Sequence, residues 1–233
     1  MTLKLYWWLP SQPSRAVKSL LTAGNVEHEE QHLDIFKHEQ KDPEYLAVNP
    51  MGQVPALTLN GKAYNESASM MRYLCSKYDS LKKFYPSEVE VRYEIDQLLD
   101  FNAAVLRPTV YPPLGAAVGK MIMKKDDLCP KEKEMMAEQR PKINALLDSF
   151  NARIQKKGKT FLTGNAITIA DFQLYCQFLD LAYYGWDWSK WPAIQKWTDA
   201  CRAAPGLKCV HDQFFEKVAT PDFVKAIGYP QTA

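Results

Sequence analysis

The sequence predicts an α/β unit followed by an all-α unit. Residues 3–77 alternate short extended runs with helical patterns in the order βαβ, a β-hairpin and a final helix. From residue 88 onward, nearly every segment carries apolar residues at helical spacing. A length of 233 residues suits one large or two modest domains. We therefore expect domains at residues 1–80 and 88–233, with 78–87 as the linker.

Local signals support each element of the first unit. The expected strands are short extended runs between turn residues, at 3–8, 28–33, 54–59 and 62–64. The expected helices are a pattern from Ser14 that stops at Gly24, a short turn over 42–46 and a helix opened by Glu66 and Ser67. The Asn60-Gly61 pair between two extended runs is the strongest short-range signal for a hairpin.

Charge and hydropathy exclude several function classes. The chain has 29 basic and 27 acidic side chains, a net charge of +2, so it lacks the excess positive charge typical of nucleic-acid binders. No apolar run approaches the roughly 20 residues that a membrane helix needs. Residues 1–10 do not have the layout of a signal peptide. We expect a cytoplasmic protein with no nucleic-acid or membrane partner.

Cysteine and histidine patterns argue against metal binding. The five cysteines are odd in number and none lies in a CxxC pair, and the four histidines form no HExxH motif. We expect buried free thiols and no metal site.

The βαβ-ββα order, with Val54-Pro55 ahead of the third strand, resembles the thioredoxin-like fold. Redox members of that fold carry a CxxC motif at the start of the first helix, where this chain has Ser11-Gln12-Pro13-Ser14. Without those sulfurs, dithiol exchange from this position is excluded. A hydroxyl at a helix N-terminus can instead donate to a bound anion, which indicates a site that stabilises the thiolate of another molecule.

Five motifs in order resemble those of the cytosolic glutathione transferases, and they are most similar to the theta (serine-type) class. They are residues 11–17, 48–50, 54–57, 65–67 and 168–172. The resemblance implies a thioredoxin-like domain that binds glutathione and an all-α domain that lines the electrophile site. It also implies a homodimer.

Within this resemblance Ser11 is the catalytic residue. Its hydroxyl would donate a hydrogen bond to the glutathione sulfur and lower the thiol pKa. A thiol with a pKa of about 8.5 is only about 3% ionised at pH 7, and a drop of about two units makes it mostly thiolate, the nucleophilic form. The alternative for Ser11 is an ordinary serine at a helix N-terminus.

The resemblance also implies a set of glutathione-binding residues: Gln12, Gln40, Lys41, Gln53, Val54, Pro55, Glu66 and Ser67. Val54 and a cis Pro55 would pair with the cysteinyl unit, and Glu66 and Ser67 would bind the γ-glutamyl end. Capping alone is the alternative for Glu66 and Ser67, and a solvated surface charge is the alternative for Lys41.

The electrophile would lie against the first long helix of the all-α unit, which should be kinked or interrupted near Pro108. The residues implied there are Arg107, Tyr111 and Leu114, with Met121 as a further wall residue. Arg107 could support a sulfur or leaving-group anion, or it could be a salt-bridged structural residue. The aromatic run over 183–191 favours core packing, and Asp171 is expected to cap a helix that begins after Thr168.

These residues predict a glutathione transferase that attacks hydrophobic electrophiles such as halides, epoxides, activated aromatics and peroxides. It would need no cofactor, because glutathione is a co-substrate. The alternative is a non-catalytic relative that serves as a binding or dimerisation module. Intact Ser11, Glu66 and Ser67 argue against that alternative.

Overall fold

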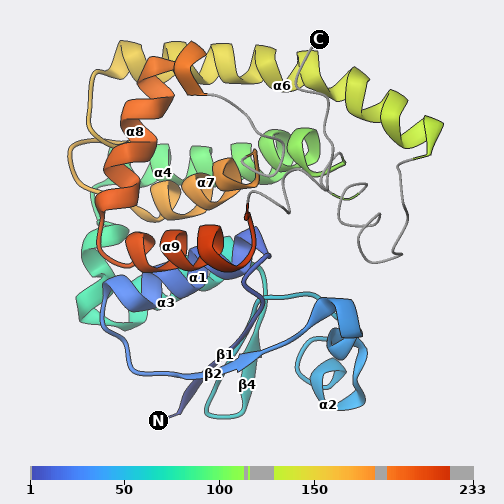
Figure 1. The fold of residues 1–233 in the computed structure, drawn as a ribbon. Coiled ribbons are helices and arrows are strands. Elements are labelled where there is room, and N and C mark those ends of the chain that lie inside the picture. The colour runs from blue at the N-terminus through green and yellow to red at the C-terminus, as the bar shows by residue number, and fades with distance from the viewer. Residues whose placement is uncertain (1, 113–114, 116–128, 182–187, 221–233) are drawn as a thin grey trace.

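A four-stranded sheet forms the base of the N-terminal unit in the computed structural model, which describes residues 2–112, 115, 129–181 and 188–220 (Figure 1). The strands are β1 (Leu3–Trp7), β2 (Glu29–His32), β3 (Ala56–Leu59) and β4 (Lys62–Tyr64), in the order β2-β1-β3-β4. β1 runs parallel to β2 and antiparallel to β3, which also pairs antiparallel with β4. The predicted βαβ-ββα order is confirmed.

Two helices cover one face of this sheet and a short helix lies on the other side (Figure 1). They are α1 (Gln12–Ala23), α3 (Ser67–Lys77) and the short α2 (Pro43–Leu46). Alternate residues of β1 point toward α1 and α3 and join the main core, whereas Tyr6 faces the opposite way and packs on Tyr45 of α2. Period-two alternation in β1 therefore places two separate apolar clusters on the two faces.

The hairpin between β3 and β4 turns at Asn60 and Gly61, as the sequence predicts. Their φ angles are 51° and 78°, and both are positive, as a two-residue type I′ turn requires. Two 3-10 turns that the sequence did not predict, at Ile35–Lys37 and Glu39–Lys41, connect β2 to α2.

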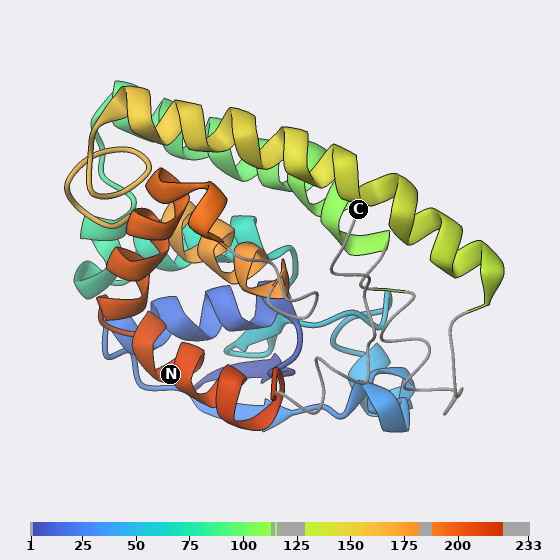
Figure 2. The same cartoon turned by 45° about the horizontal axis from the view of Figure 1, so that its top comes forward.

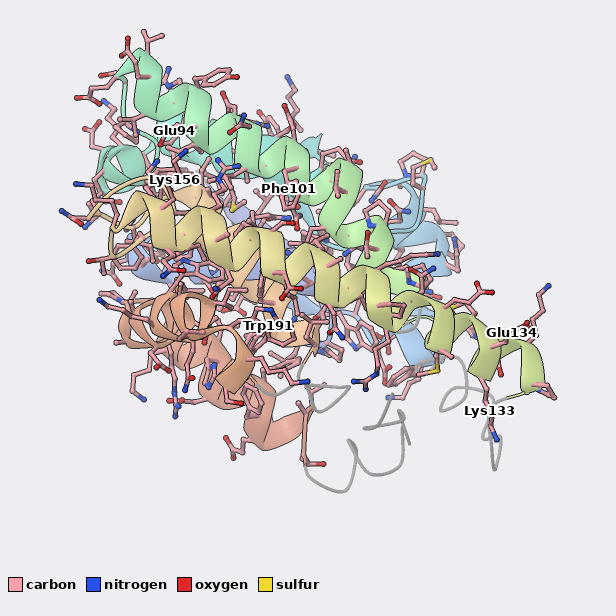
Figure 3. The ribbon with its side chains drawn as sticks, turned by 90° about the horizontal axis from the view of Figure 1, so that it is seen from above. Glu94, Phe101, Lys133, Glu134, Lys156 and Trp191 are labelled. Carbon is pink, nitrogen blue, oxygen red and sulfur yellow. The ribbon has the colours of Figure 1, made fainter. Side chains whose placement is uncertain are left out.

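The second unit is mainly helical in its described part, with a non-helical connection over 158–168. Its main elements are α4 (Val89–Phe101), η4 (Asn102–Leu106), α6 (Pro130–Lys157), α7 (Ile169–Leu179), η6 (Trp188–Lys190), α8 (Pro192–Ala203) and α9 (Leu207–Lys217). α4 and α6 run antiparallel side by side (Figure 2), with Phe101 stacked on Phe150. Glu94, near the middle of α4, pairs with Lys157 at the end of α6, and Figure 3 shows Glu94 close to the neighbouring Lys156.

η4 is a π-helical turn at the end of α4, just ahead of Pro108. A proline lacks the backbone N–H that would continue the α-helical ladder, and such interruptions often take the form of a π-turn. The predicted interruption of this helix near Pro108 is confirmed.

α7 occupies the centre of the molecule, and every one of its residues is buried. It packs along α1 of the first unit and against α4 and α8 of its own unit. Its first turn is capped as predicted, because Asp171 accepts the Thr168 N–H at 2.8 Å. The same carboxylate accepts from Leu162 and Trp197, and burial raises its pKa while these bonds oppose the rise. Asp171 therefore serves folding.

The expected linker over 78–87 is instead packed into the core. Its 3-10 helix η3 (Asp79–Phe84) buries Leu81 and Phe84, and the Phe84 ring meets Phe172 of α7 edge-on at 5.3 Å. One continuous apolar cluster includes side chains from both units. The two units are therefore joined through a shared core.

The cysteine prediction is right for three residues and wrong for two. All five are free, and Cys75, Cys176 and Cys201 are buried, but Cys129 and Cys209 are exposed near the starts of α6 and α9. In the described part of the chain, no helix combines the length and apolar character needed to span a bilayer.

Candidate active site

Ser11 occupies the N-cap position of α1, at the end of the turn that leaves β1. Its backbone is extended, with φ −77° and ψ 117°. Its N–H donates to the Trp8 carbonyl, and its own carbonyl accepts from the Arg15 N–H, both at 3.0 Å. The half-buried hydroxyl makes no capping hydrogen bond and has no partner among the described residues. It therefore remains available as a donor at a positive helix end.

The Arg15 side chain holds the turn that precedes Ser11 in place. Its fully buried guanidinium donates to the carbonyls of Leu9 and Pro10 at 3.1 and 2.8 Å, the two residues that precede Ser11. The same group forms a 2.5 Å ion pair with Asp180, just after α7. Burial raises the pKa of Asp180, and the Arg15 charge opposes that rise.

A second connection between the units starts at Gln12, the first residue of α1. Its Nε2 donates to the Gln173 carbonyl at 2.9 Å, and its Oε1 accepts from Arg107 Nη1 at 3.3 Å. The Gln173 side chain in turn donates to the Ser67 hydroxyl at 3.2 Å. The Gln12 side chain is 2% exposed, so it faces the helical unit and not an open surface.

Arg107 and Tyr111 lie together, with the guanidinium carbon 4.9 Å from the centre of the Tyr111 ring. Arg107 forms no ion pair with a carboxylate among the described residues, so the salt-bridged alternative is not what the structure has. Tyr111 is half exposed. The predicted Leu114, like Met121 and residues 183–187, lies outside the described residues.

Val54 and Pro55 lead into β3 through a cis peptide bond, as the resemblance implied. The preceding Gln53 carbonyl accepts from the Tyr45 hydroxyl at 2.5 Å and from Asn49 Nδ2 at 2.7 Å. These bonds fix the turn, whereas neither backbone polar group of Val54 has a partner among the described residues. Val54 therefore offers a backbone edge for pairing.

Gln40 and Lys41 lie at the 3-10 turn before α2, beside Gly52. Gly52 has a φ of +60°, and a Cβ there would lie 2.8 Å from Lys41 Nζ, so this glycine makes the close approach possible. The Lys41 ammonium forms no ion pair among the described residues. Gln40 is buried, and its Oε1 has no hydrogen-bond partner there.

Glu66 and Ser67 stand at the start of α3, as predicted. Glu66 precedes the helix with a φ of 67°, a conformation that costs a non-glycine residue energy and that is enriched at functional sites. Its carboxylate is exposed and makes no ion pair among the described residues. The capping-only alternative fails for Glu66, since its side chain makes no cap bond.

Known proteins resemble this chain in sequence and in fold. The family model described as "Glutathione S-transferase, N-terminal domain" matches residues 5–82, and "Glutathione S-transferase, C-terminal domain" matches residues 110–205. Glutathione S-transferase F10 of Arabidopsis thaliana is 31% identical over 172 residues, which cover 73% of this chain and 77% of that protein. The chain belongs to the glutathione S-transferase family.

Other relatives differ in class. Glutathione S-transferase theta-2 of Homo sapiens is 27% identical over 214 residues, covering 89% of this chain and 84% of that protein. The solved structure of "Glutathione Transferase E6 from Drosophila melanogaster" superposes with a TM-score of 0.81 at 27% identity and covers all of both chains. The matches establish the glutathione S-transferase family and leave the class open.

Three polar residues of the helical unit at the interface with α1 were missed by the sequence analysis. Gln173, Gln177 and Asp180 follow one another at spacings of four and three, on an otherwise apolar helix and its last turn. That spacing places them on one face. Buried polar side chains need hydrogen-bond partners. Three polar residues on one face of an apolar helix are therefore the sequence signal that could have predicted this interface.

A separate cavity of about 570 Å³ lies beside the C-terminal half of α7, against α8 and α9, with Tyr175, His211 and Phe215 in its lining. None of the predicted site residues of this glutathione S-transferase lines it. Burial lowers the pKa of His211 to about 4, so this imidazole is neutral at physiological pH. The cavity is thus apart from the Ser11 site.

The strained backbone at Glu66 leads to a prediction. Glu66→Gly should raise the free energy of unfolding by about 1 kcal/mol, because glycine adopts this positive φ without strain, and should weaken glutathione binding by about tenfold or more. Urea unfolding and calorimetric titration measure the two effects. Glu66→Ala is the matched control, which loses the carboxylate without relieving the backbone. Equal stability of the two variants would contradict the strain, and unchanged affinity in both would contradict the binding role.

Proposed function

We propose that this glutathione S-transferase activates glutathione through Ser11, whose hydroxyl donates to the cysteinyl sulfur. The observation that carries the proposal is a half-buried serine hydroxyl at the N-terminus of α1 with no partner among the described residues. Both the hydroxyl and the positive helix end favour an anion over a neutral thiol. They therefore lower the thiol pKa and raise the fraction of nucleophilic thiolate at pH 7.

The rest of glutathione is proposed to lie across the turns around this hydroxyl. Val54 presents an unpaired backbone edge for the cysteinyl unit, next to Pro55. Glu66 offers a carboxylate for the γ-glutamyl ammonium, and Ser67 a hydroxyl at the start of α3 for its carboxylate. This assignment is supported by the exposed, unpaired Glu66 carboxylate.

The glycyl carboxylate is proposed to meet Lys41, with Gln40 and Gln53 as further polar contacts. The support is the Lys41 ammonium, which has no carboxylate partner among the described residues and is folded against Gly52 beside the Gln53 turn. Gln12, which the sequence predicted as a glutathione ligand, is given no glutathione contact in this proposal, because both ends of its amide already have protein partners.

The electrophile is proposed to lie on the Arg107 and Tyr111 side, with Leu114 as a further wall. The thiolate sulfur attacks the electrophilic carbon, a C–S bond forms, and the leaving group departs with its bonding electrons while the thiol proton goes to solvent. Halides and activated aromatics fit this step. In an epoxide the C–O bond breaks, and the oxygen stays attached to the product and takes a proton from solvent. A peroxide would be attacked at oxygen: the O–O bond breaks, an alcohol leaves, and a second glutathione converts the resulting sulfenic acid to glutathione disulfide and water. The Arg107 cation supports the anion that departs. The reaction as proposed needs no cofactor.

A theta-like, serine-type class forms part of the proposal. Its support is Ser11 itself, together with the human theta-2 relative, which aligns over 89% of this chain. A cytoplasmic location is likewise proposed, and its support is that all five cysteines are free thiols.

Removal of the Ser11 hydroxyl tests the central step. Ser11→Ala should lower kcat by ~10²-fold or more while glutathione affinity stays within about tenfold, because the hydroxyl acts on the sulfur and not on the rest of the tripeptide. Steady-state kinetics with an aryl halide and calorimetry measure the two quantities. Ser14→Ala, one turn deeper in α1 and fully buried, is the matched control. Unchanged turnover in Ser11→Ala would remove Ser11 from the mechanism.

A homodimer is the last part of the proposal. Val89 and Tyr93, four residues apart on one face of α4, are 75% and 66% exposed, and Met51 is 70% exposed. Large apolar side chains so open to solvent are typical of contact surfaces. Sedimentation should give about twice the chain mass of 26.7 kDa, and Tyr93→Glu should shift it toward the monomer. A monomeric wild type at micromolar concentration would contradict this.

A further inference from the structure

Gln12 joins three parts of the molecule through one buried amide. It directly follows Ser11, its Nε2 donates to the Gln173 carbonyl on α7, and its Oε1 accepts from Arg107 Nη1. Its side chain is 2% exposed, so these two bonds replace bonds to water. The link to Arg107 spans 95 residues of sequence.

Arg107 depends on such a link for its position. It follows the π-helical turn η4 and directly precedes Pro108, where the regular backbone ladder is interrupted. A long arginine side chain loses considerable rotamer freedom when it is held in one place. Its contacts in the described part of the chain are the Tyr111 ring and the Gln12 oxygen, and the Gln12 oxygen is the directional one of the two. The Asp180 carboxylate also attracts Arg107, but its ion pair is with Arg15.

The chemistry of the partner matters as well. A carboxylate beside Arg107 would hold the guanidinium and also cancel its charge. A neutral amide oxygen accepts the hydrogen bond and leaves the positive charge available to another anion. The amide also supplies a donor for the Gln173 carbonyl, which a carboxylate cannot do.

We infer that Gln12 is a positioning residue, which holds the Arg107 guanidinium beside the Ser11 turn without neutralising its charge, so that the cation can stabilise the leaving-group anion. This inference rests on the proposed function for its chemical consequence. In this role Gln12 acts through Arg107 and does not itself touch the reacting atoms.

A double-mutant cycle tests the coupling. Gln12→Met, which removes both hydrogen bonds at similar volume, should lower kcat/KM for 1-chloro-2,4-dinitrobenzene by about tenfold while KM for glutathione changes less than twofold. In an Arg107→Met background the same substitution should cost less than twofold, because the group it positions is gone. An equal cost in both backgrounds, or an effect confined to KM for glutathione, would overturn the inference.

Matched variants separate positioning from general destabilisation. Gln97 on α4 accepts from Arg153 at 2.9 Å in the same chemical arrangement, far along the chain from Ser11, so Gln97→Met should leave the kinetics unchanged. Gln12→Glu should keep an acceptor for Arg107 but cancel its charge, and should lower kcat/KM at least as much as Gln12→Met. Wild-type turnover in Gln12→Glu would contradict the role of the neutral amide. Should Gln12→Met fail to fold, Gln12→Ala replaces it in the cycle.

A ligand-free measurement distinguishes failure of the inference from failure of the proposed function. In ¹⁵N NMR of the arginine side chains, the Arg107 guanidinium, identified by its absence in Arg107→Met, should rotate slowly in wild type and freely in Gln12→Met. Equal rotation in the two proteins overturns the inference whatever the activity. Absent glutathione-dependent turnover in wild type would contradict the proposed function alone.

Discussion

The buried ion pair between Arg15 and Asp180 is the constraint on which the arrangement of the site depends. Both side chains are essentially inaccessible to solvent, and the two residues are 165 positions apart. Burying two charges is costly, and their attraction offsets that cost only when the remaining donors are also satisfied. Here the two terminal nitrogens, Nη1 and Nη2, also reach the carbonyls of Leu9, Pro10 and Cys176. Removing one partner of such a pair costs about 3–5 kcal/mol.

The pair has a geometric consequence for chemistry. Leu9 and Pro10 lead directly into Ser11, so the position of the serine hydroxyl is set by a carboxylate that belongs to the helical unit. The next residue, Gln12, is likewise held by the helical unit, through its hydrogen bonds with Gln173 and Arg107. The proposed thiolate side and the proposed electrophile side are therefore both connected to the same buried helix, α7, through Arg15 and Gln12, and both units contribute residues to the proposed site.

Much of this molecule could be predicted from local sequence. The hairpin at Asn60-Gly61, the cap at Thr168 and the end of the first helix at Gly24 depend on interactions within a few residues, which local sequence specifies. The resemblance to the glutathione S-transferase family likewise predicted that Arg107 and Tyr111 lie close together, as they do in the structure. The placement of Gln12 could not be predicted, because its partners are 95 and 161 residues away.

Other errors have the same physical origin. Residues 78–87 contain polar and turn residues typical of a linker, yet Leu81 and Phe84 find apolar partners on α1, α3 and α7 that only the folded chain supplies. Cys129 is the N-cap residue of α6 and Cys209 lies in the first turn of α9, so the burial of either thiol depends on whether another element covers it. At these positions tertiary packing, and not local composition, determines whether a side chain is buried.

The most direct test of this account is the pKa of the glutathione thiol bound to Arg15→Lys, followed by ultraviolet absorbance of the thiolate as pH is raised. Lysine keeps the charge that pairs with Asp180, but it lacks the planar fork that reaches Leu9 and Pro10 at the same time. The account predicts a bound-thiol pKa at least one unit above that of wild type, with glutathione affinity changed by less than about threefold. A bound-thiol pKa equal to that of wild type, in a folded Arg15→Lys protein, would contradict it.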